Sequence, residues 1–216
     1  MTYLKSIDPT NTVLLVIDMQ EGFLSENGGF ARSIGPANIQ NQRAIIPAVG
    51  ELVRLCRAAG LPILWSQQVH FPDDQTRKQR VIPSHLDKRG ISMCLRGSDE
   101  IGIAAELLDD VSPADILFEK HRASCFYNTT LETKLRMLGT RVVIISGINS
   151  NYCVDSTVRD AYFREFDVVL VKDCVAGTFQ DLHEAFIKNF DLYFGDSFTL
   201  EEMKTLLSAN LSEAVA

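Results

Sequence analysis

Three residues of different chemistry, Asp18, Lys120 and Cys153, each end or closely follow a short apolar run of the chain. A thiol attacks a carbonyl only as the thiolate, so it needs a base to take its proton and a cation to stabilise the anion. A carboxylate, an ammonium and a thiol that meet in space therefore predict a nucleophilic site. The alternative for Cys153 is a thiol that only packs in the core.

The runs that carry these residues have the composition of buried strands. Five runs, rich in β-branched residues, cover positions 12–18, 61–68, 114–120, 141–148 and 167–173, and a shorter sixth strand is expected near 190–195. Amphipathic stretches such as 41–60 and 128–139 separate most of them. The alternation predicts one α/β domain over residues 1–216, a three-layer α/β/α sandwich with a mostly parallel, doubly wound sheet of about six strands.

Ligands of open parallel sheets bind beyond the carboxyl ends of the strands, so Asp18, Lys120 and Cys153 should converge at that edge. If Ser150 or Asn151 caps the following helix, Cys153 lies in the first turn, where the helix dipole favours a thiolate. Backbone N–H groups at this helix start would form an oxyanion hole for a carbonyl that becomes tetrahedral. The arrangement suits acyl transfer from a small amide to water.

Composition narrows the classes of protein and partner. The net charge of −7 argues against a general nucleic-acid binder, which needs a basic face, and no apolar run approaches the length that spans a bilayer. The first residues, "MTYLKSIDPTN", lack the pattern of a secretory signal. Five scattered cysteines without a C-x-x-C pair suggest reduced thiols. We therefore expect a cytoplasmic protein that binds neither nucleic acid nor membrane.

The stretch 69–98 contains no clear element and is the longest such segment of the chain. Its cationic residues are Arg77, Lys78, Arg80, Lys88, Arg89 and Arg96. A solvated surface loop is one interpretation. A lid or a contact with a partner subunit, which would help to attract an anionic substrate, is the other.

Four blocks of the chain resemble the isochorismatase-like cysteine hydrolases: "LLVIDMQEGF", "FEKHRASCFYNT", "SGINSNYCVDSTVRDA" and "VKDCVAG". The resemblance implies an α/β/α sandwich with Asp18, Lys120 and Cys153 as the catalytic triad. It also implies a non-prolyl cis peptide between Ile148 and Asn149, in the turn that aims the amides of Tyr152 and Cys153 at the oxyanion. Homodimers or homotetramers with pockets near an interface are typical of such proteins.

The sequence of this chain differs from the motifs of other branches of the family, and these differences narrow the range of activities that we expect. Nicotinamidases carry a metal-binding Asp-x-His after the second strand, whereas "SQQVHFPDD" has Gln68 and a single His70, so we expect no metal and no cofactor. His121 and Cys125 are four residues apart, but two ligands do not make a metal site. Isochorismatases that cleave a vinyl ether lack the nucleophilic cysteine.

The block "KHRASCFYNTTLETKLRMLG" looks most like the ureidoacrylate, biuret and N-carbamoyl amidohydrolase branch. The predicted function is a cysteine amidohydrolase that cleaves a small linear amide or carbamoyl compound through a thioester. Ureidoacrylate, biuret, triuret and N-carbamoyl amino acids are the candidate substrates. A metal-dependent nicotinamidase-like deamidase and a catalytically silent binding protein with the same fold are the alternatives.

Residues near the triad in sequence or at the expected sheet edge are candidates for contact with the substrate. They are Gln20, Phe23, Gln68, His70, Phe126, Tyr127, Asn128 and Tyr152.

Overall fold

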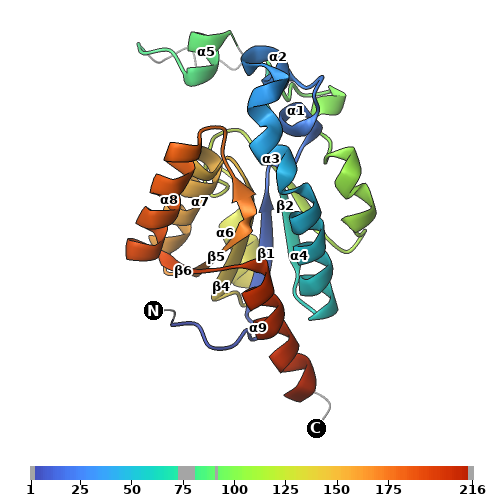
Figure 1. Ribbon diagram of the computed structural model, residues 1–216, viewed down its shortest axis with the longest axis vertical. Helices are drawn as coiled ribbons and strands as arrows, with labels where there is room; N and C mark the ends of the chain where they lie inside the picture. The colour runs from blue at the N-terminus through green and yellow to red at the C-terminus, as the bar shows by residue number, and fades with distance from the viewer. Residues whose placement is uncertain (1–2, 73–80, 91, 214–216) are drawn as a thin grey trace.

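The computed structural model describes residues 3–72, 81–90 and 92–213, and it is built around one parallel sheet (Figure 1). The six strands lie in the order β3-β2-β1-β4-β5-β6, and every pairing between neighbours is parallel. Their bounds are β1 Thr12–Ile17, β2 Ile63–Gln68, β3 Ile116–Lys120, β4 Val142–Ile148, β5 Asp167–Ala176 and β6 Gly195–Phe198. The predicted α/β class, the parallel sheet and the number of strands are confirmed.

Helices cover both faces of the sheet, with α4 and α9 on one side and α6, α7 and α8 on the other (Figure 1). The α-helices are α1 Glu21–Leu24, α2 Gly29–Ile34, α3 Gln40–Ala44, α4 Ile46–Ala58, α5 His85–Arg89, α6 Leu131–Met137, α7 Asp155–Tyr162, α8 Gln180–Tyr193 and α9 Leu200–Glu213. Short 3₁₀ turns cover Pro36–Ile39, Asp99–Ile101 and Ala105–Asp110, and a π turn covers Ser150–Val154.

The central strands β1 and β4 are buried along their whole length. Leu14 and Val16 of β1 pack into the core beneath α4 and α9, whereas Val13 and Leu15 pack into the core beneath α6, α7 and α8. Since both faces are covered, the strands are apolar at every position rather than alternating. This burial explains the uninterrupted hydrophobic runs in the sequence.

The sheet has its topological switch point between β1 and β4. The chain adds β2 and β3 on one side of β1 and then returns to place β4, β5 and β6 on the other side. Crossovers on either side of such a point leave a crevice beyond the carboxyl ends of the two strands, where ligands bind. Helices α1, α2 and α5 lie beyond this edge, at the top of Figure 1.

The structure corrects the expected position of the last strand. The stretch 190–195 was expected to contain a strand, but α8 continues to Tyr193 and β6 begins at Gly195. Phe190 is buried on α8 beside Phe186, four residues earlier, so the helical periodicity of the core contacts extends through this stretch.

The long segment after β2 contains a helix that the sequence does not predict. Helix α5 starts with a capping box, in which the Ser84 side chain and the Asp87 side chain each accept a hydrogen bond from the other residue's backbone N–H.

Three of the cationic residues of this segment, Arg77, Lys78 and Arg80, lie outside the described residues. Among the described helices, none is both long and apolar enough to cross a membrane.

The contact between β4 and β1 depends on a glycine. Gly147 has a φ of +111°, and a Cβ placed there would lie 2.1 Å from the carbonyl oxygen of Ile17. Replacing Gly147 with alanine is expected to lower the free energy of unfolding by about 2–5 kcal/mol, because a backbone clash adds to an unfavourable φ.

Gly60 provides the control for this substitution. Its φ is +80°, but no atom lies within 4 Å of the Cβ position, so Gly60→Ala should cost about 1–2 kcal/mol from φ alone. Urea unfolding of both variants measures the difference. Equal losses would contradict the close approach of β4 to β1 as the cause.

Candidate active site

A buried ion pair stands at the switch point of the sheet. Asp18 directly follows β1 in a left-handed conformation (φ 55°), and Lys120 is the last residue of β3. The Lys120 ammonium lies 2.7 Å from Asp18 Oδ2, and both side chains are almost inaccessible to solvent. Burial alone would lower the pKa of Lys120, but the Asp18 carboxylate overcomes it and the net pKa is raised. Lys120 is therefore a permanent cation at neutral pH.

The two carboxylate oxygens of Asp18 have different surroundings. Ser66 Oγ donates to Oδ1 at 2.7 Å and also accepts from the Asp18 backbone N–H at 3.2 Å. Oδ2 lies at ion-pair distance from Lys120, yet no aligned hydrogen bond from a described residue reaches it. Ser66 thus fixes the carboxylate and leaves Oδ2 able to accept a proton.

Cys153 completes the cluster. Its Sγ lies 3.5 Å from the Lys120 ammonium. Burial raises the pKa of the Cys153 thiol, and although Lys120 opposes this, the Asp18 carboxylate raises the pKa further. The protonated form of the resting thiol is therefore favoured, with the Asp18 carboxylate and the Lys120 ammonium close to it.

The turn that carries Cys153 differs from the expected capped helix. Neither Ser150 nor Asn151 caps a helix; the segment is a π turn that follows Asn149 and leads into α7. The carbonyl of Asn149 accepts from the amides of Tyr152 (3.0 Å) and Val154 (3.1 Å). The peptide bond between Ile148 and Asn149 is cis, as the resemblance implied.

The hydrogen bond from the Tyr152 amide to the Asn149 carbonyl limits which backbone amides can form an oxyanion hole. Because the Tyr152 amide already donates to Asn149, it is not available to an oxyanion in this arrangement. The Cys153 amide, one residue further along the turn, remains the candidate donor.

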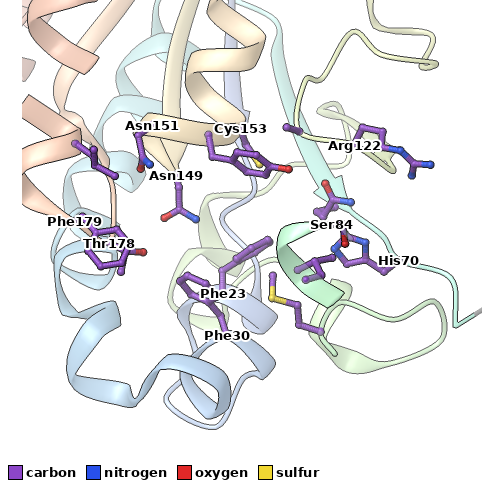
Figure 2. Close-up of a pocket in the computed structure, with 16 residues that line it drawn as sticks. Phe23, Phe30, His70, Ser84, Arg122, Asn149, Asn151, Cys153, Thr178 and Phe179 are labelled. Carbon is purple, nitrogen blue, oxygen red and sulfur yellow. The ribbon is translucent and has the colours of Figure 1, made fainter. Parts of the chain in front are cut away.

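A cavity of about 280 Å³ opens beside the thiol (Figure 2). Figure 2 shows Phe23 and Phe30 across the cavity from Cys153. Its apolar side chains are Phe23, Phe30, Leu86, Met93, Ala123, Phe179 and Leu182, and its polar ones include Gln68, His70, Ser84, Arg122, Asn149, Asn151, Tyr152 and Thr178. The cavity is large enough for a small organic molecule, and the Cys153 thiol forms part of its lining.

The chain matches known proteins over nearly its whole length. The family description "Isochorismatase domain" matches residues 12–202. The ureidoacrylate amidohydrolase RutB of Methylobacterium radiotolerans is 30% identical over 203 residues, which are 88% of this chain and 77% of that protein. The chain belongs to the isochorismatase family.

Solved structures share the fold of this isochorismatase-family chain. A cysteine hydrolase from Pseudomonas syringae pv. phaseolicola superposes with a TM-score of 0.83 at 21% identity, covering 97% of this chain and 98% of that one. A pyrazinamidase/nicotinamidase from Streptococcus mutans has a TM-score of 0.76 at 18% identity and covers 87% and 100%.

The structure brings four of the predicted substrate-contact residues to the cavity and places a fifth behind its lining. Phe23, Gln68, His70 and Tyr152 line the cavity of this isochorismatase-family fold. Gln20 lies one layer behind them, buried, with its side-chain amide paired to the backbone of Gln68. Gln20 supports the lining rather than forming part of it.

Three predicted contact residues lie outside the cavity lining. Phe126 is buried in the core, where its ring centroid is 6.0 Å from that of Phe166. Tyr127 is 54% exposed, and Asn128 is an exposed residue in a left-handed conformation. Just before Phe126, the Cys125 amide donates to Thr157 Oγ1 at 3.0 Å, which attaches the backbone of this segment to α7.

Other residues that line the cavity are not marked as site residues by any pattern in the sequence. Phe30 comes from α2, Leu86 from α5, and Thr178 and Phe179 from the segment between β5 and α8. Leu86 and Met93 belong to the stretch 69–98, so part of that segment forms a wall of the cavity. No group of three or more His, Cys, Asp or Glu residues suited to a metal ion occurs in the part of the chain that the structure describes.

Proposed function

We propose that this protein is a cysteine amidohydrolase that cleaves the C–N bond of a small linear amide or carbamoyl compound through a thioester. The coarser assignment, an isochorismatase-like amidohydrolase, rests on the family and on its named amidohydrolase relatives. The observation that carries the finer proposal is the contact of one ammonium with both a carboxylate and a thiol, at 2.7 and 3.5 Å, beside a cavity.

The first half of the reaction forms the thioester. Asp18 Oδ2 takes the proton of Cys153, and Sγ bonds to the carbonyl carbon of the substrate. The Cys153 amide donates to the developing oxyanion, while Lys120 stabilises the thiolate before attack. The C–N bond then breaks, and the proton held by Asp18 passes to the leaving nitrogen, so ammonia or an amine departs.

The second half returns the free enzyme. Asp18 takes a proton from water, the water oxygen attacks the thioester carbon, and the C–S bond breaks. Cys153 leaves as thiolate and regains the proton from Asp18, so the product acid and the resting thiol result. In the resting site, Lys120 keeps its proton because the Asp18 carboxylate raises the pKa of the ammonium against the effect of burial.

The substrate class is proposed from the relatives and the pocket together. The relative at 30% identity is named ureidoacrylate amidohydrolase. Arg122 lines the cavity and supplies a positive charge at the edge of the site. We propose ureidoacrylate, biuret, triuret and N-carbamoyl amino acids as substrates, and a homo-oligomer as the working assembly.

Ammonia release from a panel of amides tests the proposal. The panel contains ureidoacrylate, biuret, triuret, N-carbamoyl amino acids, nicotinamide and maleamate. We expect release from at least one ureido or carbamoyl compound, no release by Cys153→Ser, and unchanged release after a chelator. Cys174→Ala, which removes a buried thiol from the opposite core, is the control and should retain activity.

Each other outcome counts against the proposal. Release by Cys153→Ser at the wild-type rate would exclude the thioester, and loss of release on chelation would favour the metal-dependent alternative. A folded protein that releases no ammonia from any panel member would favour the silent binding protein. Slow alkylation of Cys153 at neutral pH does not separate these cases, since burial raises the thiol pKa in the enzyme as well.

A further inference from the structure

The side chain of Gln68 has an orientation that is imposed by its neighbour. Gln68 is the last residue of β2 and is only 4% exposed. Lys120 Nζ donates to Gln68 Oε1 at 2.8 Å. An ammonium group has donors only, so the oxygen of the amide must face Lys120 and the nitrogen must face away from it.

The amide nitrogen that results is a buried donor. Among the described residues, no hydrogen-bond acceptor reaches Gln68 Nε2. Leaving a buried N–H group unpaired is unfavourable, so such a group in a folded protein calls for a partner. Gln68 lines the cavity beside the nucleophile, so an occupant of the cavity can supply the missing acceptor.

The backbone of Gln68 is held on both sides. Gln20 Oε1 accepts from the Gln68 amide at 2.7 Å, and Gln20 Nε2 donates to the Gln68 carbonyl at 3.1 Å and to the Ile101 carbonyl at 3.0 Å. With its backbone fixed by Gln20 and its side-chain oxygen fixed by Lys120, the Gln68 donor is preorganised. A donor held in this way is suited to recognition of one particular acceptor.

The sheet order separates this donor from the oxyanion turn. Gln68 ends β2, the Cys153 turn follows β4, and β1 with Asp18 lies between them. The strand backbones are therefore separated by two strand spacings, about 10 Å. The side chains converge more closely, since Lys120 Nζ lies 2.8 Å from Gln68 Oε1 and 3.5 Å from Cys153 Sγ. Gln68 and Cys153 thus line the same cavity from strands on opposite sides of β1.

We propose that Gln68 Nε2 donates to a second oxygen acceptor of the substrate, distinct from the scissile carbonyl. The substrate class is then a carbamoyl or amide compound with two acceptor groups. Simple monoamides and alkylureas leave the donor unpaired. This inference rests on the proposed function in taking the ligand to be an amide or carbamoyl compound, but not on turnover.

Protection of Cys153 from iodoacetamide tests the inference with two probes of equal heavy-atom count. Biuret and isopropylurea share one carbamoyl group, and only biuret has a second carbonyl. Peptide mass mapping reports alkylation at Cys153 alone. In the wild-type protein, biuret should protect at a concentration about tenfold lower than isopropylurea, the loss expected when a buried donor goes unpaired.

Two variants remove the donor in different ways. Gln68→Met removes the whole amide, and Gln68→Glu keeps an acceptor for Lys120 but has no N–H group. Both should reduce the biuret preference to about onefold. Gln67→Met is the matched control, since Gln67 donates to the Ile101 carbonyl at 2.8 Å and does not line the cavity; it should retain the tenfold preference.

A preference for biuret that survives in either folded Gln68 variant would overturn the inference, as would its absence in the wild-type protein. The two proposals fail separately. Selective protection by biuret without ammonia release from any panel member refutes only the proposed function. Ammonia release without selective protection refutes only the role of Gln68.

Discussion

Asp18→Asn is expected to reduce turnover by about 10²–10⁴-fold while Cys153 becomes easier to alkylate. Asparagine tolerates the left-handed φ of 55° and can still accept from Ser66, so the backbone should be preserved. It cannot accept the thiol proton, so the amide is not attacked. Burial and the Asp18 carboxylate raise the pKa of Cys153 and Lys120 lowers it, so removing the carboxylate leaves only burial to oppose Lys120, and the thiol pKa should fall.

The opposite changes in the two measurements make this variant informative. Alkylation by iodoacetamide should accelerate about tenfold for each unit by which the thiol pKa falls. Ammonia release from the best amide of the panel measures turnover in the same preparation. Slower alkylation together with slower turnover would mean that Asp18 activates the thiol in the resting state, in conflict with the proposed proton transfer.

Lys120→Met is expected to lower the free energy of unfolding by about 3–5 kcal/mol and to abolish activity. The substitution leaves the Asp18 carboxylate as a buried charge without its partner. An unpaired buried charge lowers the stability of the fold more than replacement of both members of the pair does. For a protein of this size, Tm should fall by about 2–4 °C per kcal/mol. Thermal and urea unfolding measure the effect.

Two further variants show whether the loss comes from the unpaired charge. Lys204→Met removes a lysine from a solvent-exposed pair with Glu51 and should leave stability nearly unchanged. The double variant Asp18→Asn/Lys120→Met contains no unpaired charge and should recover part of the stability that Lys120→Met loses. A double variant less stable than Lys120→Met would contradict the ion pair as the source of the effect.

Much of the fold and the clustering of Asp18, Lys120 and Cys153 could be predicted from the sequence because the relevant signals are local. Each strand is a short apolar run, and Asp18 and Lys120 mark the points at which two of these runs end. The rule that parallel strands end at one edge then brings distant residues together. The structure confirms the predicted strands to within a few residues, apart from the last one.

The cavity could not be predicted in the same way, because its walls depend on packing between distant segments. Phe30 and Leu86 reach the cavity from the short helices α2 and α5, which no hydrophobic periodicity in the sequence predicts. Phe126 follows Lys120 closely in sequence, but its ring packs in the core beside Phe166 instead. The donor orientation of Gln68 depends on Lys120, which lies on the neighbouring strand.

The position of β1 between β2 and β4 has a consequence for the order of folding. Thr12 of β1 pairs with Val142 of β4, so the contact that juxtaposes Asp18 and Cys153 closes one of the longest loops in the chain. Contacts of such sequence separation form slowly, because chain entropy is lost before they are made. During synthesis, β1 can pair with β2 long before β4 leaves the ribosome. Cys153 therefore meets Asp18 only late in folding, and a partly made chain lacks the cluster of Asp18, Lys120 and Cys153.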